Sequence, residues 1–441
     1  MANTYATRTL GTPTGTTKNT LSLWVKLSNL STNRSPIFAN SNGGGVHFRT
    51  NDKIDFYNAG GSLRTNKIFR DTSAWYHIVV STDTTLGTAD DRLKMYINGV
   101  QQTSFEVRNN PSQNATSSLG SATAHDIGRN NSPANYFDGL ISHIQMVDGT
   151  AYDATAFGQY DANGVWTIKT SPSVTYGNNG FFILKDGNSV TDQSGNSNNF
   201  TVGGGTLTNT EDSPSNVFAT LNPLIINNFL LPNMTYAATS EGNNTLTGTS
   251  ATNNGHCYST LGASSGKFYC EVKIITTIGG YPFIGIMPEE GLIPTSSSIY
   301  GLVGYDFADT VSYERSGDKR INSSASSFGD TYGLNDIIGI AMDLDNGAVY
   351  FSKNGTFQNS GNPTSGASKT GAALTFTANN KNYFFGGTAY TTSTQIKVNF
   401  GNGYFGTTAV ASAGTNASGI GIFEFDVPTG FTALSTKGLN L

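Results

Sequence analysis

The most suggestive chemistry in the sequence is an acidic cluster, Asp343, Asp345 and Asn346, directly before Gly347 in the stretch AMDLDNGAVYFSKNGT. A calcium loop of the EF-hand type places acids or amides at alternate positions, a glycine at the sixth and an acid at the twelfth. Here the glycine comes one residue early, and the twelfth position is Asn354. Apolar residues alternate on both sides of Asn346-Gly347, which predicts a β-hairpin instead of a metal loop.

The same hairpin sets an expected register. Pairing Leu344 with Val349 gathers the apolar residues on one face and leaves Asp343 and Asp345 on the other face with Tyr350. The acids are then predicted to be turn and surface groups. The apolar face would consist of Ile338, Ile340, Met342, Leu344, Val349 and Phe351.

Two motifs could carry hydrolytic chemistry. GASSG (262–266) matches the G-x-S-x-G nucleophile elbow, which exposes its serine on a strand-to-helix turn. A strand follows here, so we expect a hairpin turn and an inert Ser264. Glycan hydrolysis needs two carboxylates about 5–10 Å apart, and the nearest match is Glu424 with Asp426, which no third acid follows. We therefore predict that the protein is not an enzyme, with a glycan depolymerase as an alternative.

Transition-metal sites have no support in the spacing of the ligands. The five histidines are His47, His77, His125, His143 and His256, and they show neither His-x-x-x-His nor Cys/His spacing. His77, in WYHIVV, is predicted to be a strand residue with a satisfied ring. No transition metal and no organic cofactor is expected.

Two cysteines occur, Cys257 and Cys270, so no disulfide framework supports the fold. They flank STLGASSGKFY. If that segment forms a hairpin, pairing Leu261 with Gly266 sets the two cysteines opposite each other, a geometry that a disulfide could bridge. Synthesis in a reducing cytosol favours two buried thiols instead.

Sugar binding needs an aromatic ring beside amide or hydroxyl groups at a sandwich edge or loop end. In NDKIDFYNAGG, Tyr57 stands beside Asn58. For each aromatic candidate a buried or half-buried core position is the favoured interpretation, and Trp24, Trp75 and Trp166 have the apolar surroundings of core residues. The segment YGLVGYDFADTVSYERSGDKR supplies a second set of candidates: Tyr300, Tyr305, Tyr313 and Arg315.

The elements that must position these residues are β-strands. Charged residues make up 12% of the chain, against a usual share of about 25%, while Gly (52), Tyr (20) and Phe (26) are abundant. Period-2 alternation dominates, and Asn98-Gly99 marks a two-residue turn. The one helix expected is short, DATAFG, with Asp153 as its N-cap and Gly158 at its end.

Charge and hydropathy exclude two classes of partner. The net charge is −5 and no run of Lys or Arg occurs, so nucleic acid is not an expected partner. The N-terminal stretch MANTYATRTLGTPTG has no apolar core, so no signal peptide is expected. The longest apolar stretch, PLIINNFLLPNM, is too short to span a bilayer, so no membrane insertion is expected.

Both halves of the chain read as all-β, which predicts two β-sandwich domains in tandem. The first is expected at 1–224 and includes a closing segment rich in Gly and Asn at about 167–224. The second is expected at 225–441.

Several motifs in fixed order resemble known families. LSLWVKLS, FRDTSAWYHIVVSTDT, DDRLKMYINGVQQ and YFDGLISHIQMVDGTAY resemble a laminin-G-like (concanavalin A-like) jelly roll. SGKFYCEVKI, the stretch from SGDKRINSS to FSKNGT, and VNFGNGYF resemble a SPRY domain, a two-sheet sandwich. FGQYDANGVW, YGNNGFFI, DQSGNSNNF and FATLNPL resemble the linker that joins these two domains in virion proteins of marine bacteriophages.

The resemblance implies a non-enzymatic virion protein, made in the bacterial cytoplasm and exposed on the particle as a tail fibre, tip or appendage. It would bind host-surface glycan or receptor and contact other virion proteins; a decoration or assembly protein without a receptor role is the alternative. A homo-oligomer, a trimer by preference, is expected. Laminin-G-like domains often hold a calcium ion at the sandwich rim, although turn capping is the favoured role of the acids concerned: Asp83, Asp90, Asp91 and Asp138.

Overall fold

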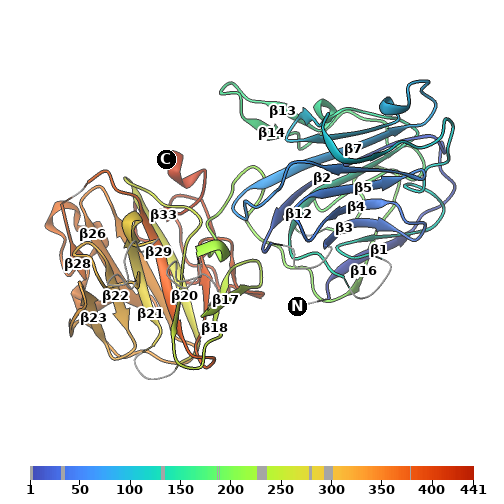
Figure 1. Ribbon diagram of the computed structural model, residues 1–441. Coiled ribbons are helices and arrows are strands. Elements are labelled where there is room, and N and C mark those ends of the chain that lie inside the picture. The colour runs from blue at the N-terminus through green and yellow to red at the C-terminus, as the bar shows by residue number, and fades with distance from the viewer. Residues whose placement is uncertain are drawn as a thin grey trace. The chain divides into compact units, whose positions relative to one another are not determined.

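The computed structural model describes residues 3–30, 35–130, 135–185, 187, 189–225, 236–277, 281–292, 301–377 and 379–441. The chain divides into two compact units, Met1–Asn209 and Thr210–Leu441, and the regular elements described in each are β-strands and short 3-10 turns joined by loops (Figure 1). The predicted all-β class with two sandwiches is confirmed. No helix in the described ranges is long and apolar enough to cross a membrane.

The first unit packs an eight-stranded sheet against a six-stranded sheet. The larger sheet runs in the order β10 (Phe105–Asn109), β6 (Gly61–Thr65), β5 (Ile54–Asn58), β4 (Gly45–Phe48), β3 (Ser35–Asn40), β11 (Ala124–Ile127), β1 (Tyr5–Thr9) and β16 (Thr201–Gly204). The smaller runs β15 (Phe181–Ile183), β12 (Gly139–Asp148), β2 (Lys18–Leu27), β7 (Trp75–Asp83), β8 (Leu93–Ile97) and β9 (Val100–Gln101). Alternate residues of both sheets, such as Leu23 and Phe56, meet in one core, as the period-2 pattern requires.

A hairpin, β13 (Gly158–Tyr160) and β14 (Trp166–Ile168), packs on the outer face of the smaller sheet. The predicted helix is a single 3-10 turn, η2 (Ala154–Ala156), and Asp153 caps it by accepting from the Thr155 backbone N–H, as expected. A second 3-10 turn is η1 (Ala89–Asp91).

The Asn98-Gly99 turn is a two-residue hairpin that joins β8 to β9, as predicted, and both residues have positive φ. Gly99 has φ +80°, and a Cβ there would lie 2.4 Å from the Trp166 ring. We expect Gly99→Ala to lower the free energy of unfolding by about 2–3 kcal/mol, from backbone strain plus overpacking. Gly164 has φ +77° and open space around it, so Gly164→Ala should cost only about 1 kcal/mol. Equal losses in urea denaturation would contradict the packing role of Trp166.

The second unit is also a sandwich of two large sheets. The nine-stranded sheet runs β17 (Ala237–Ser240), β18 (Thr245–Gly248), β30 (Gln395–Asn399), β20 (Lys267–Thr276), β25 (Ile337–Asp343), β26 (Ala348–Lys353) and β27 (Thr356–Phe357), with β28 (Leu374–Thr375) on β26 and β33 (Thr432–Ala433) on β20. The six-stranded sheet runs β19 (Asn254–Tyr258), β29 (Tyr383–Tyr390), β21 (Phe283–Pro288), β22 (Val311–Glu314), β23 (Asp318–Ile321) and β24 (Ser324–Ser327).

Small elements complete the second unit. They are the strand pair β31 (Tyr404–Phe405) and β32 (Thr408–Ala409) and the 3-10 turns η3 (Pro223–Ile225), η4 (Glu289–Gly291), η5 (Gln358–Ser360), η6 (Pro363–Ser368) and η7 (Gly438–Asn440).

The boundary between the units lies earlier than the sequence placed it. Residues 210–224, assigned above to the first domain, belong to the second unit. Phe218 and Leu221 are buried in its hydrophobic clusters, and the Ala219 backbone N–H donates to the Leu434 carbonyl at 2.9 Å. This stretch therefore folds with the C-terminal end of the chain.

The hairpin at Asn346-Gly347 forms, with a register different from the expected one. Met342 pairs with Val349, which leaves a four-residue turn from Leu344 to Gly347. Asp343 closes this turn, because its carboxylate accepts from the Asn346 backbone N–H at 3.0 Å and from the Asn346 amide at 2.8 Å. The six predicted apolar residues all lie in one core cluster.

Asp343 is not the surface group that was predicted. Its side chain is fully buried and lies 3.0 Å from the Lys267 ammonium. The face that it shares with Tyr350 carries a second apolar cluster, to which the C-terminal segment contributes Phe423 and Phe431. Asp345 remains exposed and accepts from the Gly266 backbone N–H, as a turn group should.

The segment between the two cysteines is not a hairpin. Cys257 lies on β19 of the six-stranded sheet, whereas Cys270 lies on β20 of the nine-stranded sheet, so GASSG joins two sheets. Both thiols are free and buried, which confirms the favoured alternative. Ser264 is exposed on this connection, which leads into a strand and not into a helix.

Candidate functional site

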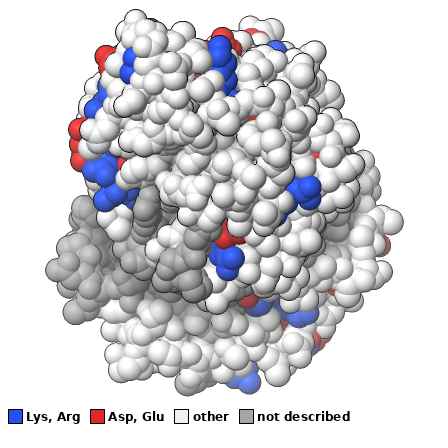
Figure 2. All heavy atoms as spheres, turned by 90° about the vertical axis from the view of Figure 1, so that its right-hand side faces the viewer, with Lys and Arg blue, Asp and Glu red and all other residues white. Residues whose placement is uncertain are grey.

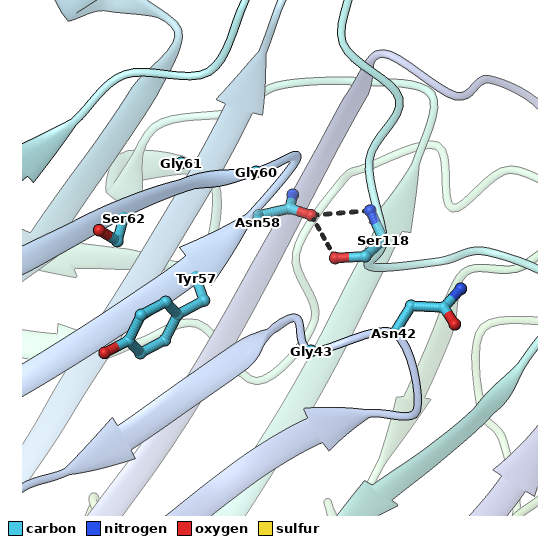
Figure 3. A pocket seen from close by; sticks show the side chains of 8 residues that line it. All are labelled: Asn42, Gly43, Tyr57, Asn58, Gly60, Gly61, Ser62 and Ser118. Atoms are coloured by element: carbon cyan, nitrogen blue, oxygen red, sulfur yellow. Dashed lines mark hydrogen bonds between the residues drawn. The ribbon is translucent and has the colours of Figure 1, made fainter.

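Three turns of the first unit surround a hollow of about 300 Å³ (Figure 3). The β3–β4 turn contributes Asn42, the β5–β6 turn contributes Gly60, and the loop before β11 contributes Ser118. Clefts that hold small ligands begin at about this volume. The residues that line the hollow are Asn42, Gly43, Tyr57, Asn58, Gly60, Gly61, Ser62 and Ser118.

Asn58, predicted as a sugar contact, instead holds the hollow together. Its side-chain oxygen accepts from the backbone N–H groups of Ser118 at 2.9 Å and Leu119 at 3.2 Å, and from the Ser117 hydroxyl at 2.9 Å. Its amide nitrogen donates to Thr82 at 2.8 Å. Figure 3 shows the side chain directed at Ser118. Asn58 is thus a positioning residue with little capacity left for a ligand.

Tyr57 lies at the margin of the hollow with its ring half-buried. Its hydroxyl donates to Asp55 at 2.8 Å, and that carboxylate also accepts from Arg64 at 2.8 Å and from Arg49 at 2.9 Å. Burial alone would raise the pKa of the Asp55 carboxyl, but the hydrogen bonds from Arg64, Arg49 and Tyr57 outweigh that effect and hold the pKa below its ordinary value. Asp55 therefore stays ionised and fixes the orientation of the tyrosine.

The site as a whole suits an uncharged ligand. None of the eight lining residues carries a charge. The charged residues beside Tyr57 are paired in one network of three cations and two carboxylates, in which Arg49 and Arg64 contact Asp55 while Arg64 and Lys53 contact Glu106. On the face shown in Figure 2, charged side chains are scattered among neutral ones. A hydroxyl-rich molecule would find hydrogen-bond partners among the uncharged residues that line the hollow.

The second set of sequence candidates is dispersed. Tyr313 was a wrong choice: it is fully buried in the core, and its hydroxyl donates to the Asp330 carbonyl. Tyr305 is half-buried, with the Arg320 guanidinium 4.8 Å from its ring centroid. Arg315 is half-buried and lies just beyond β22. Tyr300 lies outside the described residues.

The carboxylates of three of the four acids named for calcium have other side-chain or backbone partners. Asp83 lies 3.0 Å from Lys18 and caps its own turn at Thr85. Asp90 and Asp91 pair with Arg108 and Lys94 at 3.7 and 3.4 Å; Asp138 is the fourth acid, and burial raises the pKa of its carboxyl. Among the residues that the structure describes, no three His, Cys, Asp or Glu side chains come together as a metal site would require.

A serine–histidine pair that the sequence did not indicate lies in the smaller sheet of the first unit. Ser22 Oγ is 2.9 Å from His77 Nε2, and His77 Nδ1 accepts from the Trp166 indole at 3.0 Å. Because Nδ1 is an acceptor, the neutral ring carries its proton on Nε2 and donates it to Ser22. This tautomer cannot take a proton from the serine, so the pair supports packing, as the predicted satisfied ring implied.

The two acids nearest to a hydrolase signature also serve the backbone. Glu424 Oε2 accepts from the Ala411 N–H at 2.8 Å, and Asp426 Oδ1 accepts from the Thr415 N–H at 2.7 Å. Both therefore close turns of the C-terminal segment.

Sequence reasoning missed most of the lining of the hollow, including Asn42, Ser62 and Ser118. Glycine pairs in SNGGG and NAGG did signal turns there. Nothing in the sequence indicated that these turns meet, since the loop that carries Ser118 is distant along the chain.

A comparison with known protein families finds a match within the first unit. Residues 2–155 match the laminin G family model that is described as the concanavalin A-like lectin/glucanases superfamily. That match supports the laminin-G-like resemblance predicted for the first domain. No curated protein matches the chain.

Solved structures that are similar to the chain include two SPRY domains and stonustoxin. The SPRY domain of human HERC1 has 14% identity and TM-score 0.28, over 40% of this chain and 96% of that one. A human SPRY domain has 16% identity and TM-score 0.27, over 37% and 94%. Stonustoxin has 17% identity and TM-score 0.27, over 41% of this chain and 27% of its own.

Proposed function

We propose that this chain is a non-enzymatic binding protein of a bacteriophage particle, and that its first unit takes a neutral sugar of the host surface in the hollow beside Tyr57. The observation that carries the proposal is the uncharged lining of that hollow next to an oriented aromatic ring. Aromatic faces contact the apolar side of a pyranose, and hydroxyl and amide groups bind its hydroxyls.

The virion setting rests on the resemblance of the linker motifs alone, whereas the concanavalin A-like match of residues 2–155 supports the lectin-like fold of the first unit. One shallow hollow of this size gives weak binding, so attachment to a cell requires many copies on one particle. Homo-oligomeric display with other virion proteins, a trimer by preference, supplies that avidity. Cryo-EM of intact particles would locate the chain on the head or the tail.

The test is binding of the full chain to immobilised neutral oligosaccharides that contain glucose, galactose, mannose and N-acetylglucosamine. We expect Tyr57→Ala to weaken binding about tenfold, the equivalent of about 1.4 kcal/mol. Tyr57→Phe keeps the ring but loses the hydrogen bond to Asp55 that orients it, so it should weaken binding less than Tyr57→Ala does. Tyr160→Ala removes an exposed tyrosine outside the hollow and is the matched control.

Three outcomes separate the alternatives. Retention that depends on Tyr57 supports a receptor-binding protein. No retention on any glycan at high valency would instead favour a decoration or assembly protein. Release of reducing sugar, lost in Glu424→Gln, would identify a depolymerase.

A further inference from the structure

The six-stranded sheet of the second unit ends in an exposed edge strand, β24. Its sequence is Ser324-Ala325-Ser326-Ser327, and all four residues are exposed. It pairs on one side with β23, from Asp318 opposite Ser327 to Ile321 opposite Ser324, and no strand among the described residues pairs with its other side. The backbone N–H and C=O groups of every second residue therefore point toward the side of β24 that faces away from β23.

The other edge strands of four or more residues that the structure describes differ from β24. Strand β10 carries Glu106 and Arg108 and has a register shift. Strand β16 contains Gly203-Gly204 and also has a register shift beside it. Strand β17 is buried in part, and β19 almost entirely. Charges, bulges, burial and short length are the usual means of blocking edge-to-edge pairing, and of these β24 has only its short length of four residues.

We propose that β24 is a self-association edge, which pairs antiparallel with β24 of a second copy of this chain about a twofold axis. The inference is independent of the sugar site and of the preferred trimer, because a twofold contact joins two copies and cannot by itself build a threefold assembly. Two six-stranded sheets would then join into one continuous sheet, with the free N–H and C=O groups of both edges hydrogen-bonded across the axis.

Strand geometry restricts the register of this contact. Backbone groups of alternate residues point to the free side, so residues that face each other across a symmetric antiparallel contact must be both even-numbered or both odd-numbered. The twofold axis therefore passes through a residue and not between two residues. Ala325 and Ser326, at the centre of β24, are the two choices that pair most of the strand. In either register most facing side chains are Ser or Ala, which neither clash nor repel, and serine hydroxyls can hydrogen-bond across the strands.

A second copy fits this edge better than an unrelated strand because the edge is complementary to itself. It has no charge that would repel its copy and no large side chain that would need a pocket on a partner. One pair of four-residue strands is much smaller than the roughly 1,200–2,000 Å² of a stable specific interface. Association should therefore be weak between free chains and stronger where copies are held together.

The test is sedimentation equilibrium of the full chain from micromolar to millimolar concentration. We expect reversible dimerisation, weakened about tenfold or more by Ser326→Asp or Ser326→Lys, because like charges then face each other near the axis. Mixing the Asp and Lys variants should restore association, since opposite charges then meet. Thr201→Asp on β16, the other uncharged and exposed edge, is the matched control and should not change it.

Circular dichroism of each variant checks that the fold is kept, as expected for a substitution at an exposed position. A wild-type chain that stays monomeric throughout would overturn the proposal. So would dimerisation that Ser326→Asp leaves unchanged, or a failure of the mixed variants to associate. Capture of an added foreign strand by β24, without self-association, would show a different occupant and also overturn it.

Discussion

Lowering the pH from about 6.5 to about 4.5 is expected to cost the first unit roughly 4 kcal/mol of unfolding free energy, through two buried histidines. Burial, and next the charge of His143, lowers the pKa of His77 to about 3, and burial lowers that of His125 to about 4. In the unfolded chain both rings bind a proton below their ordinary pKa of 6.5. The unfolded state thus gains protons that the folded state cannot, and stability falls as the pH falls through this window.

Urea denaturation followed by tryptophan fluorescence measures this effect in the first unit, because Trp24, Trp75 and Trp166 all lie there. Replacing either histidine should halve the pH dependence of the unfolding free energy. The variants are His77→Gln, whose side chain can still accept from Trp166, and His125→Gln. Equal stability of the wild type at pH 7 and pH 4.5 would show that the rings are protonated in the folded state.

Removing the Asn58 side chain is expected to cost about 4 kcal/mol of unfolding free energy, because each buried donor left unpaired costs about 1–3 kcal/mol. Asn58→Ala leaves the backbone N–H groups of Ser118 and Leu119 without their acceptor and breaks the bond to Thr82. The loop that carries Ser118 would then lose its attachment to β5, and the hollow its shape.

Asn42→Ala is the matched control, since Asn42 lines the same hollow from an exposed turn. It should change stability by less than about 0.5 kcal/mol. Both variants are compared with the wild type in the same urea titration. A similar loss in the two, or no loss in Asn58→Ala, would contradict the positioning role of Asn58.

Local patterns predicted much of the fold. Alternation indicated the strands, and the Asn-Gly pair indicated the hairpin turn at Asn98. These signals succeed because side-chain direction and turn conformation depend on neighbouring residues. The register at Asn346 escaped prediction because Asp343 closes a longer turn with its own side chain.

The candidate site was predicted only in part. The sequence indicated Tyr57 with Asn58, and both line the hollow. It could not distinguish their roles, because that distinction depends on a loop about sixty residues further along, whose Ser118 and Leu119 engage Asn58. Tyr313 resembled Tyr57 in its surroundings along the chain, yet its strand directs it into the core.

The sequence by itself determined that this protein is made of strands and that it has two sandwiches. Only the tertiary structure decided which polar residues form the hydrogen bonds and ion pairs that hold the fold together. Asp343 is buried and pairs with Lys267. Glu424 and Asp426 each accept from a backbone N–H of a C-terminal loop, and Asn58 supports the loop that carries Ser118. The physical reason is that burial and hydrogen-bond partners come from segments far apart in the chain, and no local pattern records where those segments meet.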